Sequence, residues 1–351
     1  MHYRHSYHAG NFADVFKHVL LCGLLAALNR KDKPWCYVDT HAGSGFYDLG
    51  SEGAARTGEW REGVARMMVL QDVPPPLAIY LDAVRAANPE GAWLSSPDSA
   101  SAASASSAHQ SGRLPSPPVA RALDLPASSA QQGVRLPSPP AAQALDALAS
   151  SARKAGRLTY PGSPAFAQAA ARATDRLLLC EKVPEVALDL RAVFARDARV
   201  AVHQRDGYEA HALLPPAEKR GLMLVDPPFE RGDELDAMAE LSLKSLSRFA
   251  GGIQALWYPV KNRHVVSGFL RRMGREATRP TLNFEFDTGA PREAEVSAAG
   301  ITKHPLRGCG LLVVNPPFRF AQEMEPSLNL IARTLAQGPD AHCTATWIRS
   351  E

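Results

Sequence analysis

The chain has 351 residues, 45% of them hydrophobic, which is enough for one substantial core, although the length alone would also allow two domains. Its 39 basic and 36 acidic residues give a net charge of +3, so the overall charge permits a nucleic-acid partner without requiring one. The five cysteines are scattered and lack metal-ligand spacing, which argues against a disulfide framework and favours a reducing cytoplasm. We expect no signal peptide and no apolar run of membrane-spanning length.

The N-terminal segment is rich in aromatic residues and histidine, and it includes Tyr3. Asn11 is a suitable N-cap for the helix that follows. Lys17 and His18 lie off the apolar face of this helix, so the pattern alone indicates ordinary polar residues on an amphipathic helix. The apolar face itself consists of Phe12, Val15, Phe16, Val19 and Leu20.

A glycine-rich loop follows the first predicted strand, residues 35–38. It reads Asp39-Thr-His-Ala-Gly-Ser-Gly45 and contains His41 and Gly43. A dinucleotide-binding fingerprint would require a third glycine near position 48, where Asp48 stands, so a nicotinamide or flavin dinucleotide is disfavoured. The spacing instead favours a loop that holds S-adenosylmethionine (SAM).

Residues 46–88 have an interrupted helical pattern, and we predict a small inserted helical subdomain. Residues 89–156 then change to Ala, Ser and Pro, and the run at 114–118 recurs 22 residues later at 136–140. We predict that this segment is a disordered insert, because it has few large apolar side chains. Two copies are too few for a solenoid, while docking segments for a partner are an alternative. Residues 1–45 and 157–351 would form the main domain.

Strands and helices alternate after the insert. Tyr160-Pro-Gly-Ser-Pro164 predicts a turn, followed by a helix through about Thr174. Together with residues 35–38, later apolar runs predict a doubly wound, mostly parallel α/β sheet of seven strands. Glu181 ends the second strand, where a carboxylate can accept from both hydroxyls of a cofactor ribose; the alternative is a solvated loop acid. Asp206 and Gly207 follow the predicted strand at 200–203. The later predicted strands are 177–180, 200–203, 221–225, 253–258, 282–286 and 310–314.

The apolar strand at 221–225 ends at Asp226-Pro-Pro-Phe229. Ligands of open α/β sheets bind beyond the carboxyl ends of the strands. The Asp226 carboxylate and the Pro227 carbonyl could accept the two hydrogens of an adenine amine and stabilise the positive charge that develops as its nitrogen attacks. Phe229 offers a face on which an unstacked base can lie. The alternative is an ordinary turn after a strand.

A similar run, Asn315-Pro-Pro-Phe318, follows the last predicted strand. We interpret it as a look-alike without a catalytic role. A fold with one cofactor loop after its first strand has its reaction centre beside the fourth strand, and Asp226 follows the fourth predicted strand.

Several segments together resemble the RlmJ family of bacterial methyltransferases, which N6-methylate one adenine of 23S ribosomal RNA with SAM. They are the N-terminal Tyr-Arg-His-Ser-Tyr-His-Ala-Gly-Asn with its Asp-Val-Phe-Lys-His sequel, Asp-Thr-His-Ala-Gly-Ser-Gly, Tyr-Pro-Gly-Ser-Pro, Asp-Pro-Pro-Phe and Leu-Trp-Tyr-Pro. The resemblance covers nearly the whole chain outside the insert, and it implies a Rossmann-like SAM-dependent methyltransferase fold.

The resemblance also implies roles for individual residues. Asp226 would be catalytic, with Pro227 as backbone acceptor, Phe229 as stacking partner and Tyr3 in contact with the RNA. Phe229 stands where many relatives have tyrosine, which removes a hydroxyl but keeps the stacking face. S-adenosylhomocysteine would be the product, and no metal would be needed. The cofactor would be held by His18, His41, Gly43, Ser163, Glu181, Asp206, Gly207 and Asp226.

Competing functions share these features. A DNA adenine N6-methyltransferase would use the same Asp-Pro-Pro-Phe chemistry, and relatives have been described as proteins for using external DNA as a nutrient. A non-catalytic nucleic-acid-binding protein would need neither the cofactor loop nor the Pro-Pro turn. The expectation is therefore a cytoplasmic enzyme that acts on 23S ribosomal RNA, as a monomer and without a membrane partner.

Overall fold

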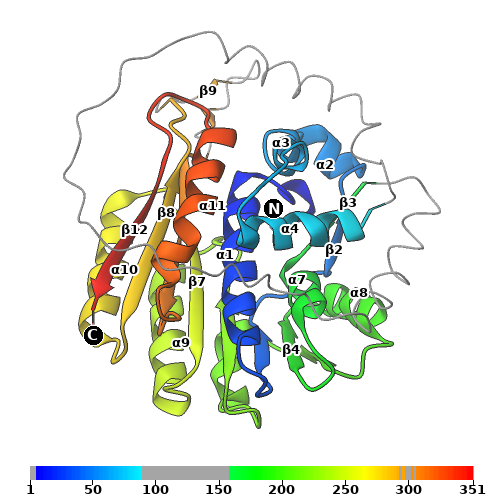
Figure 1. Ribbon diagram of the computed structural model, residues 1–351, viewed down its shortest axis with the longest axis vertical. Coiled ribbons are helices and arrows are strands. Elements are labelled where there is room, and N and C mark those ends of the chain that lie inside the picture. Colours follow the sequence, from blue (N-terminus) through cyan, green and yellow to red (C-terminus); the bar gives the residue numbers. More distant parts are fainter. Residues whose placement is uncertain (1–4, 89–157, 292–294, 297–301, 304–305, 351) are drawn as a thin grey trace.

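The computed structural model describes residues 5–88, 158–291, 295–296, 302–303 and 306–350. A central sheet lies between helices on both faces, and α1 (Phe12–Asn29) runs along the middle of one face (Figure 1). The segment at 89–156 and the residue Tyr3 lie outside the described residues.

The central sheet has eight strands in the order β12-β8-β11-β7-β6-β1-β4-β5. The strands from β7 to β5 are parallel, whereas β11 is antiparallel to both of its neighbours and β12 is antiparallel to β8. The predicted α/β fold is confirmed, but the sheet is mixed and the predicted count of seven strands is wrong. The bounds are β1 Cys36–Asp39, β4 Arg176–Glu181, β5 Val200–Gln204, β6 Gly221–Val225, β7 Ile253–Pro259, β8 Thr281–Asp287, β11 Gly308–Val314 and β12 His342–Arg349.

The missing strand in the prediction is β12, which pairs with β8 at one edge of the sheet. Most of its residues are exposed, so its sequence carries no buried apolar face to mark it as a strand. Backbone pairing with a neighbour that is distant in sequence forms this strand, and that pairing cannot be seen in a local pattern.

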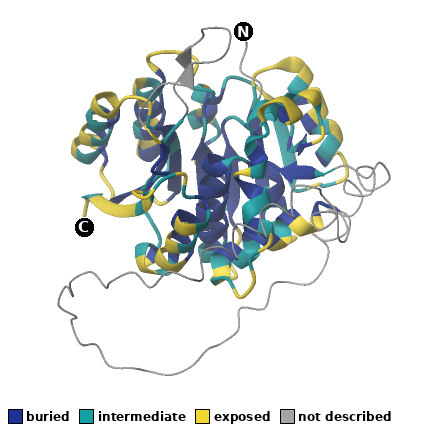
Figure 2. Ribbon diagram, turned by 90° about the horizontal axis from the view of Figure 1, so that it is seen from above, coloured by how far each residue is buried: buried dark blue, intermediate teal, exposed yellow. Residues whose placement is uncertain are grey.

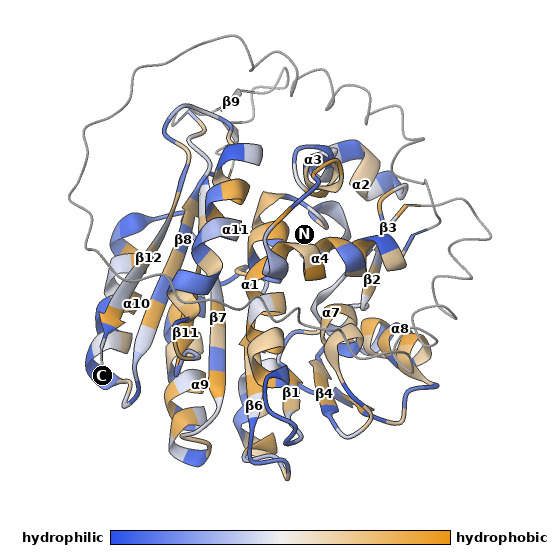
Figure 3. Cartoon of the chain, in the orientation of Figure 1, coloured by the Kyte–Doolittle hydropathy of each residue, from blue (hydrophilic) through white to orange (hydrophobic). Residues whose placement is uncertain are grey.

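Two apolar clusters hold the helices on the sheet. Tyr37 of β1 belongs to one cluster and Val38 to the other, because successive side chains of a strand point to opposite faces. Hydrophobic residues accordingly run along the central strands (Figure 3). The first cluster includes residues of α1, α4 (Pro75–Ala86), α7 (Ser163–Ala170), α8 (Pro184–Phe194) and α11 (Phe320–Thr334), and the second includes residues of α9 (Glu234–Arg248) and α10 (Arg263–Glu276).

Helix α1 is buried on nearly all sides. The Asn11 side chain accepts hydrogen bonds from the N–H groups of Ala13 and Asp14, so the predicted N-cap is confirmed. The amphipathic interpretation is wrong, because α4, α7 and α11 pack against the helix and Lys17 and His18 are only 4% and 1% exposed. Buried residues gather in the middle of the molecule (Figure 2). The helix is also long and apolar enough to cross a membrane, contrary to expectation, but 83% of it is buried inside the protein.

A second, small sheet pairs β2 (Phe46–Asp48) with β3 (Thr159–Pro161). The predicted turn at Tyr160-Pro161 is therefore wrong; the Pro-Gly signal marks the end of a strand, and α7 ends at Ala170 instead of about Thr174. Residues after β2 are largely helical, in α2 (Glu52–Thr57), α3 (Val64–Met68) and α4. The remaining short elements are the 3-10 helices His5–Tyr7, Glu59–Arg61 and Gly207–Leu213 and the strands β9 (Glu295–Val296) and β10 (Thr302–Lys303).

Candidate active site

Four acids share one edge of the sheet, and three of them, Glu181, Asp206 and Asp226, were predicted site residues. Asp39 ends β1, Glu181 ends β4, Asp206 lies just beyond β5, and Asp226 directly follows β6. These strands are adjacent and parallel, so their carboxyl ends meet at the same edge. Asn315 follows β11, which runs the other way, and therefore lies at the opposite edge. Its side-chain amide donates to the Gly251 carbonyl at 3.1 Å.

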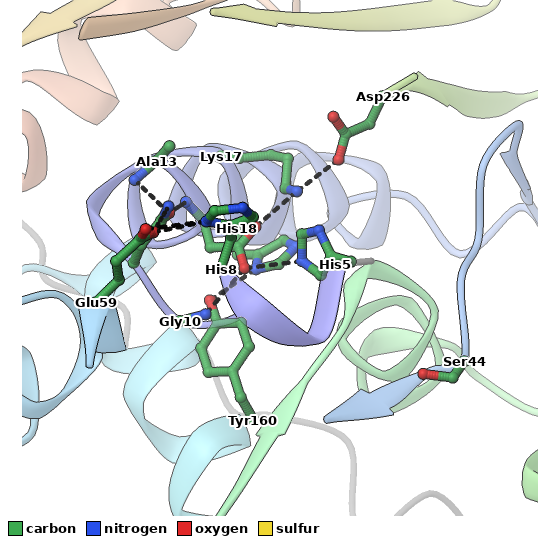
Figure 4. A network of polar contacts seen from close by, with 12 residues as sticks. His5, His8, Gly10, Ala13, Lys17, His18, Ser44, Glu59, Tyr160 and Asp226 are labelled. Carbon is green, nitrogen blue, oxygen red and sulfur yellow. Dashed lines mark hydrogen bonds and ion pairs between the residues drawn. The ribbon is translucent and has the colours of Figure 1, made fainter. Parts of the chain in front are cut away.

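Lys17 holds the Asp226 carboxylate. The distance from Lys17 Nζ to Asp226 Oδ2 is 2.5 Å (Figure 4). A second carboxylate, that of Asp14, lies 2.8 Å from the same ammonium. Burial by itself would lower the pKa of Lys17, but Asp14 and Asp226 outweigh it and raise that pKa, so the side chain stays charged. One oxygen of Asp226 is thus fixed, and Oδ1 is left to accept from a ligand.

The network extends from Asp14 to the N-terminal segment. Asp14 Oδ2 accepts from the Gly10 N–H at 2.9 Å and lies 3.0 Å from His5 Nε2. Burial would raise the pKa of Asp14, yet the charges of His5 and Lys17 hold it well below its ordinary value. Sequence reasoning missed Lys17 and Asp14. The signal that could have found them is an acid and a base three residues apart on an otherwise apolar helix.

Phe229 has a left-handed backbone, with φ of 51°, which is uncommon for a bulky residue and is found at functional sites. Its ring meets Trp257 edge-on at 5.6 Å between centroids. Lys17 Nζ lies 5.7 Å from the centroid of the same indole ring. Trp257 therefore contacts both the aromatic face predicted for a base and the cation that holds Asp226.

The glycine-rich loop turns back onto Glu181. The backbone N–H of Gly43, in this loop, donates to Glu181 Oε2 at 3.0 Å. The other oxygen, Glu181 Oε1, accepts from the Val183 N–H at 2.8 Å. Gly43 has φ of 62°, and an added Cβ would lie 2.2 Å from the Tyr47 hydroxyl. The positive φ and the close Tyr47 hydroxyl both favour glycine at that position, and the loop keeps the carboxylate of Glu181 in place.

Asp39 is a buried acid that sequence reasoning did not assign to the site. Its Oδ2 accepts hydrogen bonds of 2.7 Å from the hydroxyls of Ser163 and Tyr37. Burial raises the pKa of Asp39 to about 6, although these two hydrogen bonds oppose the shift. Ser163, predicted to hold a cofactor, is thus directed at this carboxylate. Ser163 is the first residue of α7, directly after the extended N-cap Gly162.

His41, Asp206 and Gly207 lie together. The Asp206 carboxylate accepts from the Tyr208 N–H at 3.0 Å and from Lys182 Nζ at 2.7 Å. A Cβ on Gly207 would lie 2.1 Å from the Thr40 carbonyl oxygen and 2.7 Å from the His41 ring, so this crossing requires glycine. Burial lowers the pKa of His41 to about 4, which keeps the imidazole neutral at pH 7.

His18 carries a buried polar atom without a partner. Its Nδ1 lies 2.8 Å from the Tyr160 hydroxyl, whereas Nε2 has no hydrogen-bond partner among the described residues. Burial, and after it the charge of Lys17, lowers the pKa of His18 well below its ordinary value. Such an orphaned atom points to a ligand, because buried polar groups are usually hydrogen-bonded.

The acids at this edge suit a cationic ligand, and His18 Nε2 is free to donate to or accept from a polar group of that ligand. Asp39, Glu181, Asp206 and Asp226 supply negative charge, while His18 supplies the unpartnered ring nitrogen. SAM has a positive sulfonium centre together with an amino-acid carboxylate, and its charge pattern fits this set. Within the described part of the chain, no group of three or more His, Cys, Asp or Glu side chains is placed to hold a metal ion.

Comparison with known proteins gives consistent matches. The family described as "Ribosomal RNA large subunit methyltransferase D, RlmJ" matches residues 32–111 and 140–349. The chain is 31% identical to "Ribosomal RNA large subunit methyltransferase J" of Escherichia coli (strain K12) and 29% identical to the protein of that name from Haemophilus influenzae, with 99% of each chain covered in both cases. A crystal structure of a Legionella pneumophila protein is similar with a TM-score of 0.67 and 27% identity, over 97% of both chains.

Proposed function

We propose that this chain, which belongs to the RlmJ family of ribosomal RNA large subunit methyltransferases, transfers a methyl group from SAM to the N6 amine of one adenine in 23S ribosomal RNA. Family membership gives the enzyme class, a ribosomal RNA methyltransferase, and implies both the use of SAM and an RNA substrate. The choice of the adenine amine rests on one observation. Asp226-Pro-Pro-Phe229 stands at the carboxyl edge with its carboxylate held by Lys17.

In the proposed reaction the protein holds SAM and the adenine so that N6 lies in line with the bond between methyl and sulfur. SAM, when bound, supplies a methyl group already activated on a sulfonium centre. Asp226 Oδ1 and the Pro227 carbonyl would accept the two hydrogens of the adenine amine and stabilise the positive charge that grows on N6. Lys17 would keep Asp226 oriented, so no reorganisation is needed at the moment of transfer.

The other site residues would bind and orient. We assign the cofactor ribose to Glu181, whose carboxylate is fixed by the Gly43 N–H. The cofactor adenine would lie near Asp206 and Gly207, beside His41. Phe229 would stack on an adenine that has left its own base stack. Ser163 would act on the cofactor side through Asp39, and Tyr3 is proposed to contact the RNA.

Labelled SAM tests this function directly. We expect methyl transfer to deproteinised 23S RNA, with the label on N6 of a single adenine after digestion to nucleosides. Assembled large subunits and duplex DNA should be measured in parallel. Transfer to DNA alone would favour a DNA adenine methyltransferase, and SAM-independent RNA binding without transfer would favour a non-catalytic binding protein.

The cellular compartment and the oligomeric state are also part of the proposal. All five cysteines are free, and four of them are buried, as in proteins of a reducing compartment. We therefore place the enzyme in the cytoplasm, where it would act on RNA as a monomer and without a membrane partner. Size-exclusion chromatography with light scattering would test the monomer.

A further inference from the structure

Three buried polar groups from different parts of the chain form a line that ends at His18. The hydroxyl of Tyr80, on α4, lies 3.3 Å from the hydroxyl of Tyr160, on β3. The Tyr160 hydroxyl lies 2.8 Å from Nδ1 of His18, on α1. All three side chains are almost fully buried. The line therefore joins the helical segment before the insert, the first strand after it and the candidate cofactor site.

Among the described residues, these groups have no other side-chain hydrogen-bond partner. Phe166 stacks on the Tyr80 ring at 5.4 Å and lies 4.8 Å from the His18 ring, both measured between centroids. Burial raises the pKa values of Tyr80 and Tyr160 well above their ordinary range and lowers that of His18. At neutral pH each of the three groups is uncharged. Each tyrosine therefore has one O–H proton, and the imidazole has one N–H proton, on either Nδ1 or Nε2.

Either direction leaves one proton without an acceptor among these three groups. If Tyr80 donates to Tyr160 and Tyr160 donates to Nδ1, the unused proton is the one on His18 Nε2. If the line runs the other way, the unused proton is that of the Tyr80 hydroxyl, whose ring is stacked on Phe166. We favour the first direction, because an acceptor of a bound ligand can pair with Nε2–H, whereas the Tyr80 hydroxyl has no other partner among the described residues.

We propose that Tyr160, supported by Tyr80, is a positioning residue that fixes His18 as its Nε2–H tautomer, so that Nε2 donates to the methionine carboxylate of the cofactor. This inference rests on the proposed use of SAM. The carboxylate is the anionic acceptor of that molecule, and Lys17, the neighbour of His18 in the chain, adds positive charge nearby. The ribose hydroxyls, which are donors, are assigned instead to the acceptor Glu181.

The tautomer can be measured without any ligand. In protein labelled with 15N-histidine, long-range proton–nitrogen spectra distinguish an Nε2–H ring from an Nδ1–H ring, and the His18→Asn variant identifies the resonance by its loss. We expect the Nε2–H pattern for His18 in the ligand-free protein. The Nδ1–H pattern would overturn the proposal, whether or not the protein proves to use SAM.

Binding tests the consequence. Calorimetry should compare S-adenosylhomocysteine with 5′-methylthioadenosine, which lacks the amino-acid carboxylate. We expect Tyr160→Phe to weaken the first ligand about tenfold and the second less than about twofold, with Tyr80→Phe giving a smaller loss in the same direction. Tyr258→Phe is the matched control, because Tyr258 belongs to the other apolar cluster and its hydroxyl donates to Asn283 and Glu285; it should leave both affinities unchanged.

Contrary results have distinct meanings. Unchanged affinity of folded Tyr160→Phe for S-adenosylhomocysteine, or an equal loss for both ligands, would overturn the positioning role. If Tyr160→Phe does not fold, Tyr80→Phe and the tautomer of the unmodified protein decide the matter. If the unmodified protein binds neither ligand, the proposed cofactor is wrong and the assignment of His18 to its carboxylate falls with it.

Discussion

Lys17 and Asp226 are 209 residues apart in the chain, yet the ammonium of one lies 2.5 Å from the carboxylate of the other. Lys17 comes from the buried helix α1, and Asp226 from the turn after β6. The contact joins the first long helix to the turn that carries the proposed chemistry. Asp14, on α1, shares the ammonium, so two acids depend on one buried base.

The first prediction concerns this shared base. Lys17→Met would remove the ammonium that Asp14 and Asp226 share, and we expect a loss of about 3 kcal/mol in the free energy of unfolding, with turnover at least about tenfold lower. Denaturant unfolding and methyl transfer at saturating SAM measure the two effects. Lys244→Met is the control, because its ion pair with Glu240 is exposed and screened by solvent, so its loss should leave stability and turnover nearly unchanged. A Lys17→Met variant with unchanged turnover would remove Lys17 from the proposed mechanism.

The second prediction concerns Glu181. Glu181→Ala removes the proposed acceptor for two ribose hydroxyls and the partner of the Gly43 N–H, so SAM binding should weaken by about 1.5–3 kcal/mol. Calorimetry measures the affinity, and Glu185→Ala, an exposed acid in the first turn of α8, serves as control. Equal affinities of the two variants for SAM would exclude Glu181 from the cofactor site.

The third prediction is a pH dependence set by Asp39. Burial raises its pKa from the ordinary 3.8 to about 6, so the folded chain binds this proton more tightly than the unfolded chain. Its contribution to stability is therefore fully present below about pH 4 and is lost as the pH rises to about 6. A bound sulfonium should favour the ionised acid instead, so SAM affinity should rise between pH 5 and pH 7 with release of a proton.

Calorimetry in buffers of different ionisation enthalpy would count that proton. The control is Asp39→Asn, which cannot ionise and should show little pH dependence of SAM affinity in this window. His41 does not interfere, because burial lowers its pKa to about 4. SAM affinity that falls as the pH rises from 5 to 7 would contradict the assignment of Asp39 to the cofactor side.

The sequence predicted the strands that carry the site residues better than the buried contacts among those residues. The apolar strand at 221–225 and its end at Asp226 are visible in a local pattern, and the structure has that strand at Gly221–Val225. Lys17 could not be assigned, because its partner lies far away in the chain and the helix pattern implied a solvent-facing side that does not exist. The local pattern did not distinguish Asp39 from the other residues of the glycine-rich loop, because its burial and its hydrogen bonds from Ser163 and Tyr37 depend on the folded structure.

The fourth prediction concerns the Ser/Ala/Pro-rich segment, and it rests on its composition and on the residues that flank it. The side chain of Asn88 accepts from the Thr159 N–H at 2.7 Å and donates to the Thr159 carbonyl at 2.8 Å. The chain therefore leaves and returns at nearly the same point, and a short connection can close the gap. Replacing residues 92–155 by a short Gly/Ser join should leave folding and methyl transfer intact. Lost transfer with retained folding would make the segment a substrate or partner arm.

The central claim is that Asp226, and not Asn315, accepts a hydrogen of the adenine amine. Asp226→Ala should lower turnover at saturating SAM by on the order of 10² or more, while folding survives, because Asp14 still pairs with Lys17. Asn315→Ala removes a hydrogen bond to the Gly251 carbonyl at the opposite edge of the sheet, so turnover should stay within about a few-fold of the unmodified protein. The most direct test is the pair of rates measured side by side on 23S RNA. A large loss for Asp226→Ala alone is the predicted result, and an active Asp226→Ala beside an inactive Asn315→Ala would contradict it.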